Sequence, residues 1–443
     1  MNYTYKFLSL SINQTVSQMK PLLRRTLAVS VLCFFGLHSF GQISSYQLNG
    51  LDGDNVVNTI TTAVPLLMIS PDARAGAMGD AGVGTTPDAN SIHWNPAKLA
   101  FIEDDMGFAV SYTPWLRALV PDINLAYLSG YKKIDDKQAI GATLLYFSLG
   151  NIVFTNIVGE VTGEFNPNEF SFDLAYSNKL GDRISGGIAL RYIYSNLTGG
   201  YYIESAGESR PGQSVAADVS TFYQDEITVG EKDAILGLGM NISNIGAKIS
   251  YTETADQDFI PINLRLGGAL TLELDEYNTI MFAGDLNKLL VPTPPIYETD
   301  SAGNPIVNSS GQNVILYGKD PNRSIVSGMF GSFGDAPGIG ADASTEERSV
   351  FREEMREITY SAGVEYWYDK QFAIRAGYFH EHATKGARKY FTLGAGLKYQ
   401  VFGLDFSYLI PTATRHPLEN TLRFSLVFDF EGFKEQGSNQ SAE

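Results

Sequence analysis

The sequence holds one cysteine, Cys33, in 443 residues, and it has no long hydrophobic run after residue 41. Because Cys33 lies in a segment that we expect to be removed, the mature protein should have neither disulfide bonds nor thiolate metal sites. Basic residues are also scarce, since 32 Lys and Arg against 49 Asp and Glu give a formal net charge of −17. Nucleic-acid binding needs a basic surface, so this balance argues against a nucleic-acid partner. Simple solubility explains the acidic charge equally well.

Residues 1–41 have the pattern of a secretory signal peptide. A basic cluster precedes an apolar run at 26–37, and small residues then lead to a cleavage site before Gln42. The apolar run is shorter than the roughly 20 residues of a membrane-spanning helix. Met1 and Met19 both remain open as the translation start.

Period-two alternation of apolar and polar residues is the main signal in the rest of the chain. In one example, Phe172, Leu174 and Tyr176 alternate with polar or charged neighbours. Such alternation is typical of strands that present one face to lipid and the other to a lumen. About 14 strands are predicted, at 105–113, 120–133, 137–149, 168–180, 182–196, 212–224, 233–243, 261–274, 277–290, 357–369, 371–380, 388–400, 402–410 and 419–430.

The predicted connections alternate between tight turns and long loops, the longest at 291–356. This is the pattern of an outer-membrane β-barrel, with short periplasmic turns and long extracellular loops. We therefore predict an all-β fold, a transmembrane antiparallel barrel over 105–430. An even strand count favours periplasmic N- and C-termini, and the polar tail 431–443 is expected to be disordered. The alternative is a soluble sandwich or barrel with its apolar face inward.

Residues 42–104 precede the first strand and are rich in Gly and Ala. Small residues allow a chain to pack within the narrow interior of a barrel, so we predict an N-terminal plug, or hatch. The alternative is a periplasmic arm below the barrel.

Two groups of apolar residues lie in predicted outer loops, where exposed apolar side chains indicate docking. The first group is Trp115, Leu116 and Leu119, and the second is Phe330 and Phe333, which lie among glycines. Protein partners are often bound through a few aromatic anchors, so these five residues are our candidate partner-binding site. Anchoring at the lipid interface is the alternative. The loop 291–356 also contains a capping-box pattern at 344–347, which predicts one short helix near Val350.

The sequence carries no recognisable catalytic or phosphate-binding signature, so we predict neither enzymatic activity nor a cofactor. His93 has no partner at metal-ligand spacing, which favours a structural imidazole and predicts no metal site. His380 and His382 are two residues apart at a predicted strand end, with nothing near them in sequence to complete an active site. An enzyme acting on lipid A through these histidines is a third, weaker hypothesis.

The segments Pro65–Arg74, Trp94–Ala100 and Ser111–Leu116 resemble the PorV (LptO) family of the Bacteroidetes type IX secretion system. The resemblance covers nearly the whole mature chain, and Asn95-Pro96-Ala97 is shared with the wider FadL-like superfamily. It implies a 14-stranded barrel with an N-terminal plug in the outer membrane, in contact with its lipid. It also implies that the protein binds cargo carrying a type IX C-terminal signal domain at the SprA translocon barrel. The cargo would then pass to the sortase-containing attachment complex, and the family has no catalytic residues to transfer.

The alternative function is that of a FadL-like transporter of small hydrophobic molecules. A transporter needs a continuous apolar route through the barrel, whereas a cargo carrier can have a filled interior. The predicted inward faces carry charged residues, which favours a polar, filled lumen: Asp173, Arg183, Arg191, Arg375 and Arg423.

Overall fold

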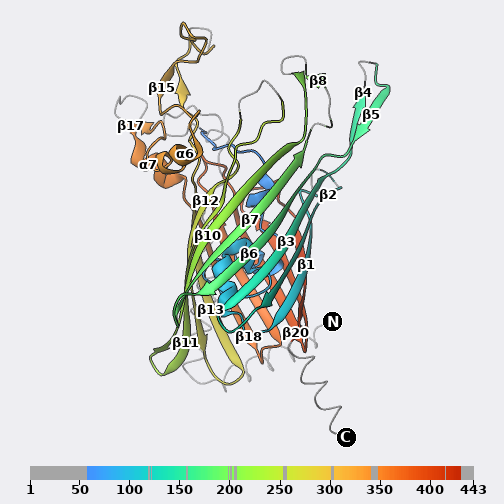
Figure 1. Cartoon of the computed structure of the whole chain (residues 1–443), viewed down its shortest axis with the longest axis vertical. Coiled ribbons are helices and arrows are strands. Elements are labelled where there is room, and N and C mark those ends of the chain that lie inside the picture. Colours follow the sequence, from blue (N-terminus) through green and yellow to red (C-terminus); the bar gives the residue numbers. More distant parts are fainter. Residues whose placement is uncertain are drawn as a thin grey trace, which may run out of the picture. The chain divides into compact units, whose positions relative to one another are not determined.

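The computed structural model describes residues 57–430, apart from 118–119, 121, 156–157, 198, 200–201, 204–206, 253–256, 301–303, 341–347 and 415. Within these residues, 14 strands form one closed barrel (Figure 1). They are β1 (Met106–Pro114), β2 (Ile123–Lys133), β3 (Gln138–Leu149), β6 (Asn168–Lys179), β7 (Ile184–Asn196), β10 (Gly212–Val229), β11 (Lys232–Gly246), β12 (Asn263–Glu273), β13 (Asn278–Leu289), β18 (Thr359–Tyr368), β19 (Phe372–His380), β20 (Lys389–Tyr399), β21 (Phe402–Pro411) and β22 (Leu422–Asp429).

Strands that follow one another around the wall pair in antiparallel fashion, and the first strand also pairs with the last. Phe108 on β1 lies opposite Gly130 of β2 on one side and Phe428 of β22 on the other. This closure removes the free edges that an open sheet would expose. The predicted antiparallel barrel and its strand number are confirmed.

Burial along the strands is the reverse of that in a soluble protein. On β6, Phe172, Leu174 and Tyr176 are exposed, whereas the intervening Ser171, Asp173 and Ser177 are buried. A polar inward face and an apolar outward face are what a lipid-embedded barrel requires. Among the described residues, no helix is long and apolar enough to cross a membrane.

The two ends of the barrel differ in their connections. One end, here the short-turn end, has tight turns such as 134–137 and 369–371. The other, the long-loop end, carries additional elements: β4 (Ile152–Thr155), β5 (Val161–Phe165), β8 (Tyr202–Ile203), β9 (Gly207–Glu208), β14 (Ile296–Tyr297), β15 (Ile315–Tyr317), β16 (Ile339–Gly340), β17 (Arg348–Ser349), and helices α6 (Ile325–Gly331) and α7 (Val350–Arg356). In Figure 1, α6 and α7 lie together at this end, to one side of the mouth.

A short helix near Val350 is present as predicted, and Ser349 caps it by accepting a hydrogen bond from the backbone N–H of Arg352. The predicted capping box at 344–347 lies outside the described residues. Helix α6 was not predicted; Ser324 caps it, with its side chain accepting from the N–H of Ser327.

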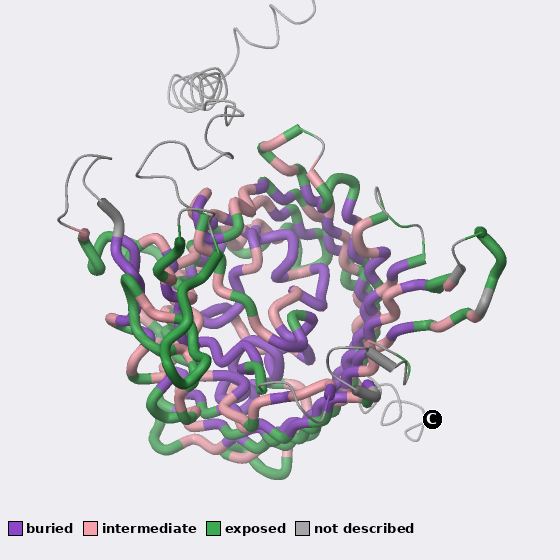
Figure 2. Tube along the Cα trace, turned by 90° about the horizontal axis from the view of Figure 1, so that it is seen from above, coloured by how far each residue is buried: buried purple, intermediate pink, exposed green. Residues whose placement is uncertain are grey.

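Residues 57–102, here the inner segment, lie inside the ring of strands (Figure 2). The segment contains η1 (Pro65–Met68), α4 (Ala73–Gly76), α5 (Ser91–Trp94) and η2 (Pro96–Phe101). Its side chains are nearly all buried from residue 63 onward. It therefore adds a core within the barrel that the strands alone would not have.

The inner segment runs from one end of the barrel to the other. Asn58 lies at the long-loop end, where its backbone N–H donates to the carbonyl of Thr384. Glu103 lies at the short-turn end, where its carbonyl accepts a hydrogen bond from the Lys133 ammonium. Because the strand count is even, β1 begins and β22 ends at the short-turn end of the barrel. The chain before β1, however, enters the barrel at the long-loop end and passes through the lumen to reach β1.

Glycine permits the close approach between the inner segment and the wall. Gly79 adopts a positive φ of 68°, and a Cβ there would lie 2.5 Å from the carbonyl oxygen of Tyr378. Across from it, a Cβ on Gly377 would lie 2.1 Å from the Gly79 nitrogen. The two backbones touch directly, and no larger residue fits at either position.

Candidate functional site: the filled interior and the loop end

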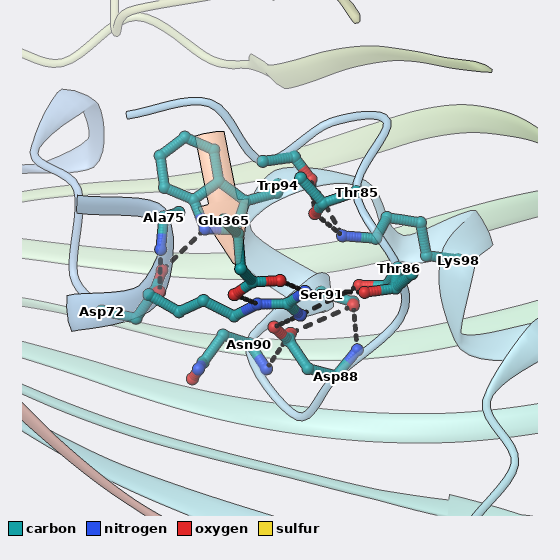
Figure 3. A network of polar contacts seen from close by, with 12 residues as sticks. Asp72, Ala75, Thr85, Thr86, Asp88, Asn90, Ser91, Trp94, Lys98 and Glu365 are labelled. Carbon is teal, nitrogen blue, oxygen red and sulfur yellow. Dashed lines mark hydrogen bonds and ion pairs between the residues drawn. The ribbon is translucent and has the colours of Figure 1, made fainter. Parts of the chain in front are cut away.

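A network of buried charges joins the inner segment to the wall (Figure 3). Arg74 makes two hydrogen bonds to the Glu365 carboxylate of β18, at 2.8 and 3.0 Å, and an ion pair of 2.9 Å with Asp88. Glu365 also accepts from Arg375 on β19 at 2.6 Å, and Arg375 pairs with Asp405 on β21 at 2.6 Å. Because buried charges are costly unless paired, this network fixes the position of Arg74 relative to three strands.

Further hydrogen bonds hold the inner segment at other points around the circumference. Asn90, for example, accepts from the Ser129 hydroxyl of β2 at 3.0 Å. Other contacts come from strands spread around the barrel: Ser185, Ser220, Asn241, Arg265, Asp285, Tyr390, Thr392 and Ser425. The inner segment is therefore anchored on all sides of the lumen rather than to one part of the wall.

Apolar residues fill the lumen towards the long-loop end. Leu66 and Leu67 of η1 are buried against wall residues such as Leu125, Phe147 and Ile193. Ile260 and Ile262, from the loop before β12, complete this cluster. The apolar part of the interior is thus occupied by the chain itself.

A second buried ionic network fastens helix α7 to the barrel mouth. The Glu357 carboxylate accepts from Lys288 of β13 at 2.7 Å and from Lys385 of the β19–β20 loop at 3.0 Å. Lys288 also pairs with Glu354 at 2.8 Å, and Lys385 with Glu353 at 2.6 Å. We call this the α7 latch. It fixes one face of a surface helix through three carboxylates and two lysines.

The loop after α6 packs onto the same latch. The backbone N–H groups of Asp335 and Ala336 donate to Glu354 at 3.0 and 3.1 Å. Burial raises the pKa of Asp335 to about 6, and the neighbouring Glu354 and Glu357 act in the same direction. Helix α6, residues 332–340 and helix α7 thus form one structure, here the cap.

A family model described as "Type IX secretion system protein PorV" matches residues 52–296, more than half of the chain. The chain belongs to this PorV family. Its barrel fold and its family place it in the outer membrane. The PorV-family chain is thus related to a protein secretion system, in agreement with the resemblance stated from its sequence motifs.

Solved structures with a similar fold are hydrocarbon-channel and FadL-type proteins. The toluene transporter TodX of Pseudomonas putida is 12% identical, with a TM-score of 0.43, over 84% of this chain and 98% of that chain. A FadL homologue from Pseudomonas aeruginosa is 11% identical, with a TM-score of 0.40, over 85% and 100% of the two chains. Comparison with curated proteins gave no match.

The five predicted partner-binding residues of this PorV-family chain lie in three different settings. Phe330 and Phe333 are exposed on the cap, at 77% and 55%. Trp115 and Leu116 are half-buried and pack against apolar residues of the interior, with the Arg423 guanidinium 6.0 Å from the Trp115 ring. Leu119 lies outside the described residues. Phe330 and Phe333 are therefore exposed on the surface, whereas Trp115 and Leu116 are partly covered by the apolar clusters of the interior.

Four of the five charged residues predicted to face inward do so, and Arg183 does not. Asp173, Arg191, Arg375 and Arg423 are buried. Arg183 lies in the turn before β7, where its exposed side chain pairs with Asp225 at 3.0 Å. The prediction for Arg183 was wrong because β7 begins only at Ile184. Arg183 lies in the turn, where side chains no longer alternate between the lumen and the outside.

Two of the histidines noted in the sequence, His93 and His382, pack against or hydrogen-bond to neighbouring side chains. His93 is buried, with its ring edge-on to Trp94 at 4.9 Å between centroids. Burial lowers the pKa of His382 to about 4, and its Nδ1 lies 3.0 Å from the Thr384 hydroxyl. In the part of the chain that is described, no group of three or more His, Cys, Asp or Glu side chains has metal-binding geometry.

Sequence analysis missed Phe351 and Met355, which are exposed at 75% and 41% on α7. Their neighbours Glu353 and Glu354 are buried, the reverse of what the polarity of these residues predicts. The sequence did offer a signal for this surface, because Phe351 and Met355 are four residues apart and so lie on one face of the predicted short helix.

Proposed function

We propose that this chain is a non-enzymatic carrier subunit of the type IX secretion system. It binds exported cargo by its C-terminal signal domain at a translocon barrel of the SprA type. It then delivers the cargo to the sortase-containing attachment complex at the cell surface. The observation that carries the proposal, beyond family membership, is that the interior is filled by the chain's own inner segment.

A filled and anchored interior leaves the long-loop end as the surface for function. A conduit needs its plug to move, yet moving this segment would uncover Arg74 and Glu365, whose pairing offsets their burial. A carrier needs no movement in the lumen, since its partners bind outside. Phe330 and Phe333, with Trp115, Leu116 and Leu119, are the proposed contacts.

The orientation and processing of the chain are part of the same proposal. The long-loop end faces the cell exterior, and the short turns and the C-terminal tail 431–443 face the periplasm. Residues 1–41 are removed as a signal peptide, and the inner segment serves as the plug.

The alternative is a FadL-like transporter of small hydrophobic molecules. The apolar cluster around Leu66 and Leu67 favours it, because a hydrophobic ligand could replace η1 there if the inner segment moved. The two functions therefore differ in whether the inner segment must move relative to the wall.

A disulfide between the inner segment and the wall separates the two functions. Asn90 and Ser129 are hydrogen-bonded at 3.0 Å, so the double variant Asn90→Cys/Ser129→Cys should form a cross-link in the oxidising periplasm. Cys33 leaves with the signal peptide in this proposal, so the mature chain carries only the two introduced thiols, and the two single-cysteine variants are the matched controls.

The locked protein is expected to recover the translocon and cargo from native outer membranes as well as wild type does, by pull-down and mass spectrometry. If the locked protein is inserted and folded but recovers neither, the carrier proposal is wrong. Loss of hydrocarbon or fatty-acid uptake on locking, without any protein partner, would instead establish the transporter.

A further inference from the structure

Helix α7 turns its acidic side chains inward and its apolar and basic side chains outward. Glu353 and Glu354 are 4% and 6% exposed and are neutralised by the lysines of the latch. On the opposite face, Phe351 is 75% exposed and Met355 41%, with the exposed Arg352 between them. A surface helix normally buries its apolar side, so this arrangement requires an explanation outside the fold.

Helix α6 presents similar residues from the other half of the cap. Its buried side is Gly328, where a Cβ would lie 2.7 Å from the Phe259 ring, and its outward side carries Val326 and Phe330. Phe333 follows the helix, and its ring lies 5.8 Å from the Lys288 ammonium of the latch. We define the cap face as the outward residues of both helices: Val326, Phe330, Phe333, Phe351, Arg352 and Met355.

The composition of the cap face is that of a protein–protein interface. Aromatic residues, Met and Arg are enriched in such interfaces, whereas Lys, Asp and Glu are depleted. The cap face has this composition on a chain whose net charge is −17, and the carboxylates of Glu353, Glu354 and Glu357 point inward to the latch. Its one exposed charge is positive, so the complementary surface is apolar with acidic groups at its rim.

The latch holds the helices that carry the cap face in fixed positions relative to each other. Glu357 links two lysines from separate strands and loops, and the N–H groups of Asp335 and Ala336 tie the α6 side to Glu354. A surface held in its binding conformation loses little entropy on association.

We propose that the cap face docks a protein partner whose surface presents an apolar pocket with acidic residues around it. The proposal rests on the carrier function and adds the site and the chemistry of the contact. An anionic membrane surface fits less well, because lipid headgroups are recognised by clusters of about four to eight basic residues. A second copy of the chain also fits less well, because a symmetric contact would oppose Arg352 to a cap face that has no acid among its six residues.

The test uses the full-length protein in native outer membranes. Two variants, Phe351→Ala and Arg352→Glu, change the cap face without touching the latch. Leu316→Ala is the matched control, since Leu316 is 50% exposed on β15 in the same loop but lies off the face. Pull-down with quantitative mass spectrometry, plus lipid analysis of the same eluates, gives the readout.

Both cap-face variants are expected to reduce recovery of one protein partner by about tenfold, with the control unchanged. The effect of Arg352→Glu should shrink at high salt, because an exposed charge is screened. Wild-type recovery of that partner in either variant overturns the inference, as does loss of lipid alone or of self-association alone. If the wild-type protein itself recovers no translocon or cargo, the carrier function fails rather than the docking site.

Discussion

At the scale of single residues, this protein buries charged side chains and exposes apolar ones, the reverse of a soluble protein. Arg375 and Arg423 are among its largest fully buried side chains, whereas Leu190 and Ile374 are 60% and 67% exposed. Buried charge is tolerated only where each group has a partner. Glu365 is shared between two such groups, because it bonds to an arginine of the inner segment and an arginine of the wall.

Replacing Glu365 by Gln should destabilise the barrel strongly. The change removes the negative charge between Arg74 and Arg375 and leaves each with one remaining carboxylate, Asp88 or Asp405. We expect a loss of about 3 kcal/mol, the lower end for breaking a buried ion pair. The midpoint of heat-induced unfolding in detergent, followed by gel mobility, measures it.

The matched control is Arg183→Ala, which breaks the ion pair with Asp225 in which the arginine is mostly exposed. Surface pairs contribute roughly 0–1 kcal/mol, so this midpoint should hardly move. Equal midpoints for Glu365→Gln and wild type would show that the buried network does not stabilise the fold.

At the scale of elements, the cap is attached to the barrel through the latch and through Ile325 and Met329 of α6, which pack against the apolar cluster of the interior. The latch holds α7 through side chains, and no wall strand continues into the helix. Elements with few contacts open locally at a lower free energy than the whole fold. The cap should therefore respond to changes that leave the barrel intact.

Asp335 makes the cap sensitive to pH. Burial raises its pKa from 3.8 to about 6, so the folded cap binds a proton more readily than the open one. The contribution of Asp335 to cap stability is thus most favourable at low pH and falls as pH rises from about 4 to about 6. Hydrogen exchange of residues 325–336, corrected for intrinsic rates, should show roughly tenfold stronger protection at pH 5 than at pH 7.

The variant Asp335→Asn should abolish this pH dependence and protect the cap at pH 7, because no charge remains to be buried. Asp320→Asn, an exposed change in the same loop, should behave as wild type. Persistence of the full pH dependence in Asp335→Asn would assign it to other groups of the latch.

At the scale of the whole molecule, the outward apolar band determines where the protein can fold. Leu190 lies in the middle of β7, between Leu174 of β6 and Ala217 of β10. These outward residues form an apolar surface that is unfavourable in water and stable in contact with lipid. The same band would be the core of a soluble sandwich if it faced inward.

Leu190→Arg should reduce the stability of the barrel in lipid vesicles by about 2–4 kcal/mol, the cost of arginine near the bilayer midplane. Leu180→Arg, at 67% exposure in a short turn, places the same charge outside the apolar band and should cost about 1 kcal/mol or less. Denaturant-dependent folding into vesicles measures both. Equal effects of the two changes would contradict the membrane position of the band.

The barrel could be predicted from sequence because alternation is a local property. The predicted strand 168–180 differs from β6 by one residue, whereas β10 and β11 extend past their predicted ends at 224 and 243. Both strands continue beyond the apolar band, where alternation is lost although the hydrogen bonds persist.

The cap and its latch could be predicted only in part. Phe330 and Phe333 were found because aromatic residues among glycines are conspicuous. The latch joins Lys288, Glu357 and Lys385, which are far apart in the sequence and meet only when β13, α7 and the β19–β20 loop converge. Without that convergence, Glu353 and Glu354 look like the exposed side of α7, and Phe351 looks like its buried side.

The inner segment also makes completion of the barrel depend on both ends of the mature chain. Its backbone at Ala73 donates a hydrogen bond to Ser425 of the last strand, across 352 residues of sequence. The same strand pairs with β1 to close the wall, so the packing of the inner segment and the closure of the barrel both depend on β22. This contact joins residues far apart in the sequence, and contacts of that kind form slowly in folding. The barrel is therefore complete only when the two ends of the mature chain meet, since β22 contacts both the first strand and the inner segment.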